Sequence, residues 1–512
     1  MENCSSSNKR LAKNTLMLYV RMLLVMFVTL YTSRVVLRVL GVEDYGIYSI
    51  VGGVVVSFSL LSNAMSGAIS RFITFALGKE ETKKVKKLFG VSVFIQICLG
   101  ILIIACGEII GSYLLNTQMS IPQGRVDAAN ILFQFSLITF VIKLFCVPFN
   151  ALIISNERLS AYAYFGIGEV GLQLSVVFLI QAFSADKLIM YGFLLAMVAL
   201  IYVTMQYIYC KLTFPSQMAS PSFDKSIFTE MANFASWNFI GTSAGILKNQ
   251  GVDIIVNVFT GVVVNAARGI AYQINTAVTN FSENFITALR PQIVKAYASE
   301  DKKRLNFLVE QGARFSGYLL LVLTIPLIFE MDTLLQLWLK VVPPYAETFA
   351  RLQLIDAVVV SLSQTLVIAL LATGKIRNYQ LMVGGINLLN MPLSWLLLYL
   401  GFPVLVTYIV SISLNILCLV CRLLFANRLA NIVIVHYLRK VVMNVIIVAC
   451  TSIVLPTIIT RFIEPSLQRM VIVMTTCVLT TLLSILYIGM TASERTYLYS
   501  KAFSLIRKPY GK

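Results

Sequence analysis

The run Lys248-Asn249-Gln250-Gly251-Val252-Asp253 interrupts an otherwise apolar segment that extends over about residues 227–258. A charged side chain near the middle of a bilayer costs ~3 kcal/mol on insertion scales. Such a run therefore persists only where it faces protein or a water-filled cavity. We predict that it lines a polar path through a membrane, which indicates transport.

The composition of the chain predicts a membrane protein over its whole length. Its 512 residues are 58% hydrophobic and only 12% charged, and the mean hydropathy is +0.83. A soluble domain carries about 25% charged residues. The net charge of +18 comes from Lys and Arg residues that cluster in short segments between apolar runs. This is the positive-inside pattern of membrane proteins, so we expect no nucleic-acid partner.

Apolar windows of ~20 residues or more predict fourteen transmembrane helices. The windows lie near residues 14–40, 46–76, 89–115, 128–154, 160–182, 188–211, 227–258, 263–296, 307–330, 348–372, 380–400, 404–425, 437–459 and 467–490. Every second connection is basic, which places these connections and both termini in the cytoplasm. The first window is too long for a cleavable signal peptide.

The chain also contains a weak internal repeat at an offset of about 220 residues. The segment Ala68–Ile73 precedes a basic connection, and its counterpart Phe285–Arg290 precedes another. Each copy holds six helices, so both copies insert with the same orientation and predict a cavity at their interface. The predicted fold is an all-α polytopic membrane protein with two six-helix lobes related by a parallel repeat. The lobes cover residues 1–215 and 216–430, followed by an extra helix pair over 431–490 and a basic cytoplasmic tail over 491–512.

The segment Arg38–Tyr48 contains Leu-Gly-Val-Glu-Asp-Tyr-Gly-Ile-Tyr. It resembles the LGxxxYGxY signature of bacterial polysaccharide (O-antigen-type) flippases, within the multidrug/oligosaccharidyl-lipid/polysaccharide exporter superfamily. The resemblance implies a transporter, not an enzyme, that needs no cofactor. It would translocate an undecaprenyl-pyrophosphate-linked oligosaccharide to the outer leaflet of the cytoplasmic (inner) membrane by alternating access. Its product would serve lipopolysaccharide or another cell-surface polysaccharide, with a polysaccharide polymerase as a partner. The fourteen-helix count resembles lipid II flippases, in which the extra pair forms a groove for the lipid tail.

A diphosphate head requires cationic donors, and the hydroxyls of its sugars suit neutral amides. On the repeat geometry, the first, second, seventh and eighth helices line the passage. The candidate substrate-binding residues on these helices are Lys248, Arg268, Arg34, Arg21, Arg71, Arg290, Asn249, Gln250 and Asn63.

Each candidate has a structural alternative. Lys248 lies at mid-membrane depth, where the alternative to lining the cavity is a structural ion pair. Arg34 and Arg268 are close enough to the outer interface to snorkel. Arg71 and Arg290 near the cytoplasmic ends also fit positive-inside anchoring. The amides Asn249, Gln250 and Asn63 could equally form hydrogen bonds between helices, which is as common a role for such side chains.

The candidates for a coupled cation are the acids Asp253, Glu169, Glu108 and Asp356. Asp253 leads because it lies in the same polar run as Lys248, whereas Glu169 and Asp356 could equally be the buried partners of polar groups. A metal site is not expected: His436 is the single histidine, and the pair Cys418 and Cys421 lies within an apolar helix without a second ligand pair.

Three rival functions remain. A cation-coupled multidrug exporter of the same superfamily would favour acids in its cavity, whereas the inventory here is basic. A membrane polysaccharide polymerase usually needs a larger outer loop. An ion channel is disfavoured because a repeat within one chain predicts two lobes that rock.

Overall fold

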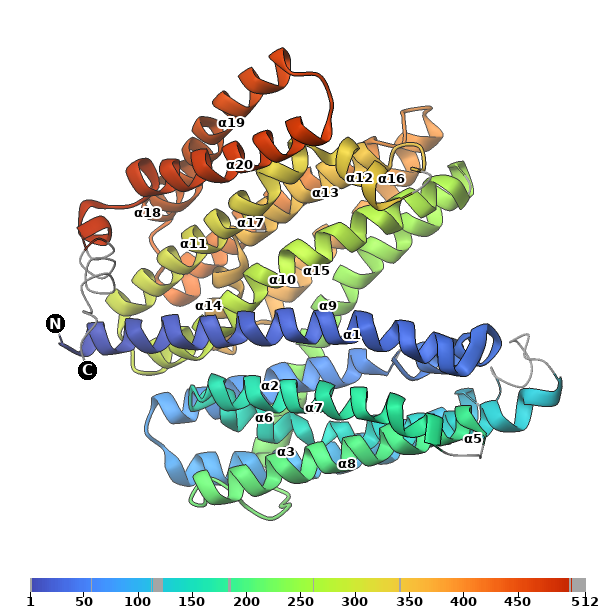
Figure 1. Ribbon diagram of the computed structural model, residues 1–512. Coiled ribbons are helices and arrows are strands. Elements are labelled where there is room, and N and C mark those ends of the chain that lie inside the picture. Colours follow the sequence, from blue (N-terminus) through green and yellow to red (C-terminus); the bar gives the residue numbers. More distant parts are fainter. Residues whose placement is uncertain are drawn as a thin grey trace, which may run out of the picture. The chain divides into compact units, whose positions relative to one another are not determined.

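The computed structural model describes residues 2–56, 58–111, 113, 123–182, 186–260, 262–339, 342–496 and 499, and this part of the chain is built from helices and their connections (Figure 1). The residues group into two compact units. Unit 1 consists of Met1–Ser243 and Thr287–Asp301, and unit 2 of Ala244–Ile286 and Lys302–Lys512.

Nineteen labelled α-helices are described, with short 3-10 and π turns between them. Their bounds are α1 (Glu2–Val56), α2 (Ser59–Gly78), α3 (Thr82–Cys106), α5 (Val126–Leu144), α6 (Cys146–Ser155), α7 (Leu159–Leu179), α8 (Lys187–Thr213), α9 (Lys225–Thr260), α10 (Val262–Ala298), α11 (Lys302–Phe329), α12 (Met331–Trp338), α13 (Ala346–Ser361), α14 (Gln364–Thr373), α15 (Arg377–Leu388), α16 (Asn390–Tyr399), α17 (Val406–Ala430), α18 (Ile434–Tyr437), α19 (Asn444–Phe462) and α20 (Leu467–Ser484).

Within the described residues, nine helical segments are long and apolar enough to cross a membrane. The bent pair of α13 and α14 would make a tenth. The predicted class, an all-α multi-pass membrane protein, is therefore confirmed, while the count of fourteen spans stays a prediction. In the same described part, α9 and α10 are not among the nine, because polar side chains such as Lys248, Asp253 and Arg268 recur along them. This composition suits helices that face protein or water rather than lipid.

Helix α1 is interrupted at Gly41, where the backbone leaves the helical region with φ 81° and ψ 171°. A residue with a Cβ is strained at this positive φ, whereas glycine adopts it without steric cost. The break lies at the predicted boundary between the first two apolar windows. It falls within the flippase-like signature, so the glycine of that motif has a local backbone role.

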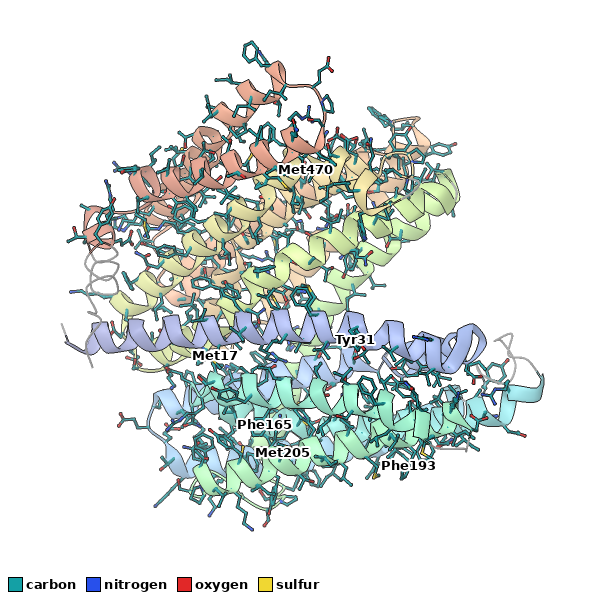
Figure 2. The ribbon with its side chains drawn as sticks, viewed as in Figure 1. Met17, Tyr31, Phe165, Phe193, Met205 and Met470 are labelled. Carbon is teal, nitrogen blue, oxygen red and sulfur yellow. The ribbon has the colours of Figure 1, made fainter. Side chains whose placement is uncertain are left out.

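Unit 1 packs α1, α3, α5, α7 and α8 around one apolar core. Val51, Leu132, Val177 and Leu188 of this core are fully buried. Large apolar side chains also cover the outside of the helices, among them Phe193 on α8 (Figure 2). An apolar exterior around an apolar core is the pattern of a protein surrounded by lipid.

A cluster of charged side chains lies at the start of α8 in unit 1. Asp186 caps the helix, its Oδ1 accepting a hydrogen bond from the backbone amide of Leu188 at 2.9 Å. Arg125, just before α5, forms ion pairs with both Asp186 and Asp44. One guanidinium thus ties the start of α8 to the segment of α1 that follows the Gly41 break.

Unit 2 has its own core, formed by α9, α10, α11, α13 and α17 with the short α12. Val256, Ala267, Phe349 and Leu354 in this core are fully buried. The last two long helices, α19 and α20, form an antiparallel hairpin that packs on α11 (Figure 1). We call these two helices the terminal hairpin.

Buried ion pairs hold both ends of α20. Near its start, Arg469 Nε lies 3.0 Å from an oxygen of Glu330, whose side chain is fully buried beside the end of α11. Beyond its other end, Glu494 pairs with Arg314 of α11. The cation belongs to α20 in the first pair and to α11 in the second, so the two elements hold each other reciprocally.

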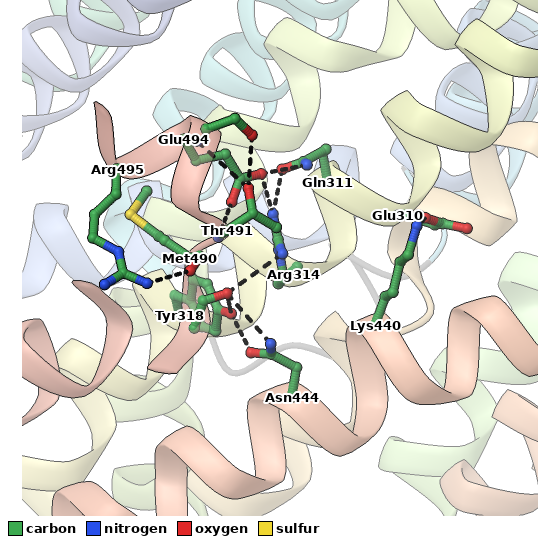
Figure 3. A network of polar contacts seen from close by, with 12 residues as sticks. Glu310, Gln311, Arg314, Tyr318, Lys440, Asn444, Met490, Thr491, Glu494 and Arg495 are labelled. Atoms are coloured by element: carbon green, nitrogen blue, oxygen red, sulfur yellow. Dashed lines mark hydrogen bonds and ion pairs between the residues drawn. The ribbon is translucent and has the colours of Figure 1, made fainter. Parts of the chain in front are cut away.

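The second of these pairs belongs to a wider polar network (Figure 3). Arg314 also donates to Oε1 of Gln311 at 2.7 Å. Tyr318 donates to the carbonyl of Gly489 at 2.8 Å. Arg314 and Glu494 therefore each have hydrogen bonds besides the ion pair, which help to offset the cost of burying the two charges.

Candidate functional site

The polar run Lys248–Asp253 lies on α9 in unit 2, and the helix continues through Gly251 without a break. Lys248 and Asp253 remain five residues apart on a regular helix, about 140° around its axis. They have different partners, as expected from that angle. A Cβ on Gly251 would lie 3.0 Å from the sulfur of Met391, so the glycine lets α9 approach α16 closely.

Lys248 is buried, with only 7% of its surface exposed. Its Nζ donates a hydrogen bond to Oδ1 of Asn415 on α17 at 2.9 Å. The Nδ2 of the same amide donates to Oδ1 of Asp356 on α13 at 2.6 Å. The Asn415 amide thus bridges the Lys248 ammonium and the Asp356 carboxylate, and the three side chains come from three different helices. We call this arrangement the Lys248–Asn415–Asp356 chain.

Arg268 on α10 pairs with Asp253, its Nε lying 2.7 Å from Oδ1 of the carboxylate. The guanidinium also donates to the hydroxyl of Thr407 at 3.4 Å. Its central carbon lies 5.0 Å from the ring centroid of Tyr408. The Asp253 side chain remains 40% exposed, whereas that of Arg268 is 12% exposed. The pair therefore has one accessible side and one side packed against α17.

The charges of these groups in unit 2 do not cancel. Arg422 on α17 donates to the Ser363 hydroxyl at 2.5 Å and contributes a third cation near Lys248. Three cations stand against the carboxylates of Asp253 and Asp356. The cluster carries a positive excess inside a membrane-spanning unit, where an uncompensated charge is costly and usually functional.

Unit 1 holds a second group of polar residues. The guanidinium of Arg21 on α1 lies 4.5 Å from the ring centroid of Tyr162 on α7. A Cβ built on Gly166 would fall 2.1 Å from the Nε of Arg21. Gly166 therefore leaves a notch in α7 that the arginine side chain fills.

Glu169, one of the predicted ion-coupling acids, lies about one turn beyond Gly166 along α7. Lys143 on α5 donates to its Oε1 at 2.6 Å. Gln173 donates to the same oxygen at 3.4 Å. Asp253 and Glu169 are thus both paired with cations, and a coupling role for either stays a prediction.

Arg71 near the end of α2 lies against three aromatic rings. Its guanidinium carbon is 4.5 Å from the centroid of Phe72 and 5.2 Å from those of Phe75 and Phe234. Aromatic faces stabilise a desolvated cation by cation–π attraction. The cluster holds the charge of Arg71 in a partly buried position.

The remaining predicted residues are more exposed or lie outside the described part. Asn63, Asn249 and Arg290 have exposed side chains. The side chains of Arg34 and Gln250 lie outside the described residues. The structure thus brings Lys248, Asp253 and Arg268 into one unit with partners from α13 and α17, and Arg21 and Glu169 into the other.

Several residues of these clusters were not among the sequence candidates. Asn415, Arg422 and Lys143 are isolated polar residues inside apolar windows, which is the one signal that could have selected them. Asp356 carries the same signal and was among the candidates for a coupled cation. Among the described residues, no group of three or more His, Cys, Asp or Glu side chains could hold a metal ion.

The sequence matches no protein-family model and no curated protein. The fold, however, is similar to solved structures of MATE transporters. A MATE crystal structure in the bent conformation has a TM-score of 0.72 at 11% identity, and the match covers 83% of this chain and 96% of that one. An outward-facing multidrug resistance MATE family transporter of the MOP superfamily gives 0.69 at 13% identity, covering 82% and 96%. A MOP superfamily transporter from Pyrococcus furiosus gives 0.68 at 11% identity, covering 84% and 96%. The chain therefore shares the fold of these MATE structures.

Proposed function

We propose that the chain is a flippase that moves an undecaprenyl-pyrophosphate-linked oligosaccharide from the cytoplasmic to the outer leaflet by alternating access. In this proposal it serves O-antigen or a related cell-surface polysaccharide. It works in the bacterial cytoplasmic membrane with both termini in the cytoplasm, and a polysaccharide polymerase takes up its product.

The positive excess of the polar residues inside the units carries this proposal. The cluster in unit 2 combines Lys248, Arg268 and Arg422 with the carboxylates of Asp253 and Asp356, and Arg21 lies in the polar group of unit 1. A cationic drug would be repelled by such an interior, whereas a diphosphate would be attracted. The fold alone does not fix the charge of the substrate. The Pyrococcus furiosus transporter is described as having a binding pocket of reverse polarity that suggests a different function.

Arg268 is the leading candidate for contact with the diphosphate. Its guanidinium is held by Asp253, Thr407 and Tyr408 and is 12% exposed, so contact with a phosphate oxygen requires the guanidinium to turn away from the more exposed Asp253 carboxylate. Arginine offers planar bidentate bonding to phosphate oxygens. Arg21 is the corresponding candidate in unit 1.

The other predicted contacts complete the proposal. Arg71 and Arg290 receive the head near the cytoplasmic side, and Lys248 is a further proposed contact. The remaining proposed contacts are Arg34, Asn63, Asn249 and Gln250.

We further propose fourteen spans, with lobes over residues 1–215 and 216–430 and the terminal hairpin as an addition to them. The matches to MATE structures support this layout, because they account for nearly the whole of those chains and leave part of this one unmatched.

The membrane potential offers a driving force for this substrate. With the cell interior negative, each negative charge moved outward gains ~2.3 kcal/mol per 100 mV. Export of a diphosphate then requires no stoichiometric flow of Na⁺ or H⁺ through Asp253 or Glu169, because both acids are already neutralised by cations of the chain.

The test measures flipping of a fluorescent undecaprenyl-pyrophosphate oligosaccharide in proteoliposomes with an imposed potential. We expect Arg268→Ala to slow flipping at least about tenfold, equivalent to ~1.4 kcal/mol of lost stabilisation. Because Arg268→Ala also leaves Asp253 unpaired, Arg268→Ala/Asp253→Ala is measured beside it. The double variant restores the charge balance of the pair but not the cation.

Arg461→Ala, at the end of α19, is the matched control and should flip at the wild-type rate. A folded double variant that flips as fast as wild type would remove Arg268 from the mechanism. A chain that exports cationic dyes and does not move the lipid-linked sugar would instead be a multidrug exporter. That alternative follows from the multidrug resistance transporter among the structural neighbours.

A further inference from the structure

The Lys248–Asn415–Asp356 chain has the chemistry of a cation-binding site in which the Lys248 ammonium stands where a free cation would bind. Asp356 and Asn415 are each 8% exposed, nearly as buried as Lys248. The hydroxyl of Ser411 lies near the Asp356 carboxylate and stabilises its charge. Carboxylate, amide and hydroxyl groups supply the oxygen ligands that hard cations take in proteins.

The orientation of the Asn415 amide fits a positive group on one side and a negative group on the other. Its oxygen accepts from the Lys248 ammonium, and its nitrogen donates to the Asp356 carboxylate. Both bonds involve a charged group, which makes them stronger than bonds between neutral groups. A buried carboxylate without a nearby cation would cost several kcal/mol.

The neighbouring cation does not replace Lys248. Arg422 faces Lys248 from α17, but it is seven residues beyond Asn415, about 10 Å along the helix. Its guanidinium is held there by Ser363. Lys248 is therefore the group that balances Asp356, and Arg422 disfavours a second free cation beside it.

We propose that Asp356, Asn415 and Ser411 form a site for a monovalent cation, and that the Lys248 ammonium fills it as a tethered substitute for Na⁺. The inference goes beyond the proposed function, because it assigns a latent ion site to unit 2. It predicts that removal of the ammonium converts a protein indifferent to Na⁺ into one that binds it.

The experiment compares thermal unfolding of the purified full-length protein in NaCl and in choline chloride, both at about 0.15 M and about pH 8, where free carboxyls are ionised. We expect the wild type to unfold at the same temperature in both salts. Lys248→Ala should unfold roughly 3 °C or more higher in NaCl, because Na⁺ binds only the folded state. Lys248→Ala/Asp356→Ala should lose this difference.

The matched control is Lys84→Ala, which removes a lysine from an exposed pair with Glu81 and should behave as wild type. Equal unfolding temperatures of Lys248→Ala in the two salts would overturn the proposal, as would a Na⁺ response of the wild type. If Lys248→Ala folds only in NaCl, the proposal is supported. If it folds in neither salt, Lys248→Met, which keeps an apolar stem, is measured instead under the same criteria.

Failure of Lys248→Met as well, in both salts, would also overturn the proposal, because Na⁺ then does not replace the ammonium. None of these measurements uses the lipid-linked sugar. A failure of this inference is therefore distinguishable from a failure of the proposed function.

Discussion

Replacing Glu494 by Gln is expected to loosen the terminal hairpin from α11. The carboxylate pairs with Arg314, whose side chain is only 6% exposed, while that of Glu494 is 19% exposed. Removing one partner of a buried ion pair costs about 3–5 kcal/mol, because the other charge stays buried without compensation. Arg314 keeps its bonds to Gln311 and to the carbonyl of Gly489, so we expect the lower value, ~3 kcal/mol.

The fully buried thiol of Cys477 on α20 reports the opening of the hairpin. In a background with the other cysteines replaced, its labelling by a membrane-permeant thiol reagent follows the open population. A loss of ~3 kcal/mol accelerates labelling by roughly 100-fold. Arg314→Met/Glu494→Gln removes both charges and should return the rate to within about threefold of wild type, since coupled partners are not additive.

Glu464→Gln, an exposed acid in the turn of the same hairpin, serves as the control and should label at the wild-type rate. The reasoning is refuted if Glu494→Gln labels less than about threefold faster than wild type, or if the double variant is as fast as the single one. Acidification provides a second check. Burial raises the pKa of Glu494, but hydrogen bonds from Thr491 and Gln311 and the charge of Arg314 lower it more, leaving it below its ordinary value.

The sign of the pH dependence follows from this depressed pKa. The stabilisation by Glu494 is complete above the pKa of the unfolded chain, about 4.3. It is lost as the pH falls through the lower pKa of the folded state. The difference in labelling rate between wild type and Glu494→Gln should accordingly be full at neutral pH and disappear in strong acid.

Two further predictions concern unit 1. Gly166→Ala places a Cβ 2.1 Å from the Nε of Arg21, so it should displace that guanidinium and slow flipping of the lipid-linked sugar. The control is Gly168→Ala, whose Cβ would have no neighbouring atom within 4 Å and which should flip at the wild-type rate. Equal flipping rates of the two variants would show that the position of Arg21 does not matter for transport. Asp186→Ala removes the cap of α8 and an ion pair with Arg125, and should lower the free energy of unfolding by about 1 kcal/mol. Burial raises the pKa of Asp186, but bonds from Arg125 and backbone amides lower it overall, so this difference should fade as the pH falls through that depressed pKa and should not grow.

The sequence was sufficient for the features that depend on local composition. The membrane class follows from the shortage of charges, and the break in α1 follows from a glycine between two apolar windows. The polar character of α9 and α10 was readable in the same way, because residues such as Lys248 and Arg268 stand out against their apolar neighbours. These features involve only the residues of one segment.

The partners of the polar residues could not be derived in this way. Lys248 bonds to Asn415, which is 167 residues away. Arg314 pairs with Glu494 across 180 residues. The depth of a side chain in the membrane follows from counting residues, but the rotation of each helix about its axis is set by packing against its neighbours. An isolated amide in an apolar window therefore signals that a partner exists without indicating which helix supplies it.

The distance in sequence between Lys248 and Asn415 has a consequence for biosynthesis. Ribosomes add about 5–20 residues per second, so the 167 residues between them take roughly ten to thirty seconds to synthesise. During that interval α9 has left the ribosome, but the amide that solvates its lysine does not yet exist. Until α17 is made, insertion of α9 into lipid bears the cost of an unpaired lysine, ~3 kcal/mol at mid-membrane depth.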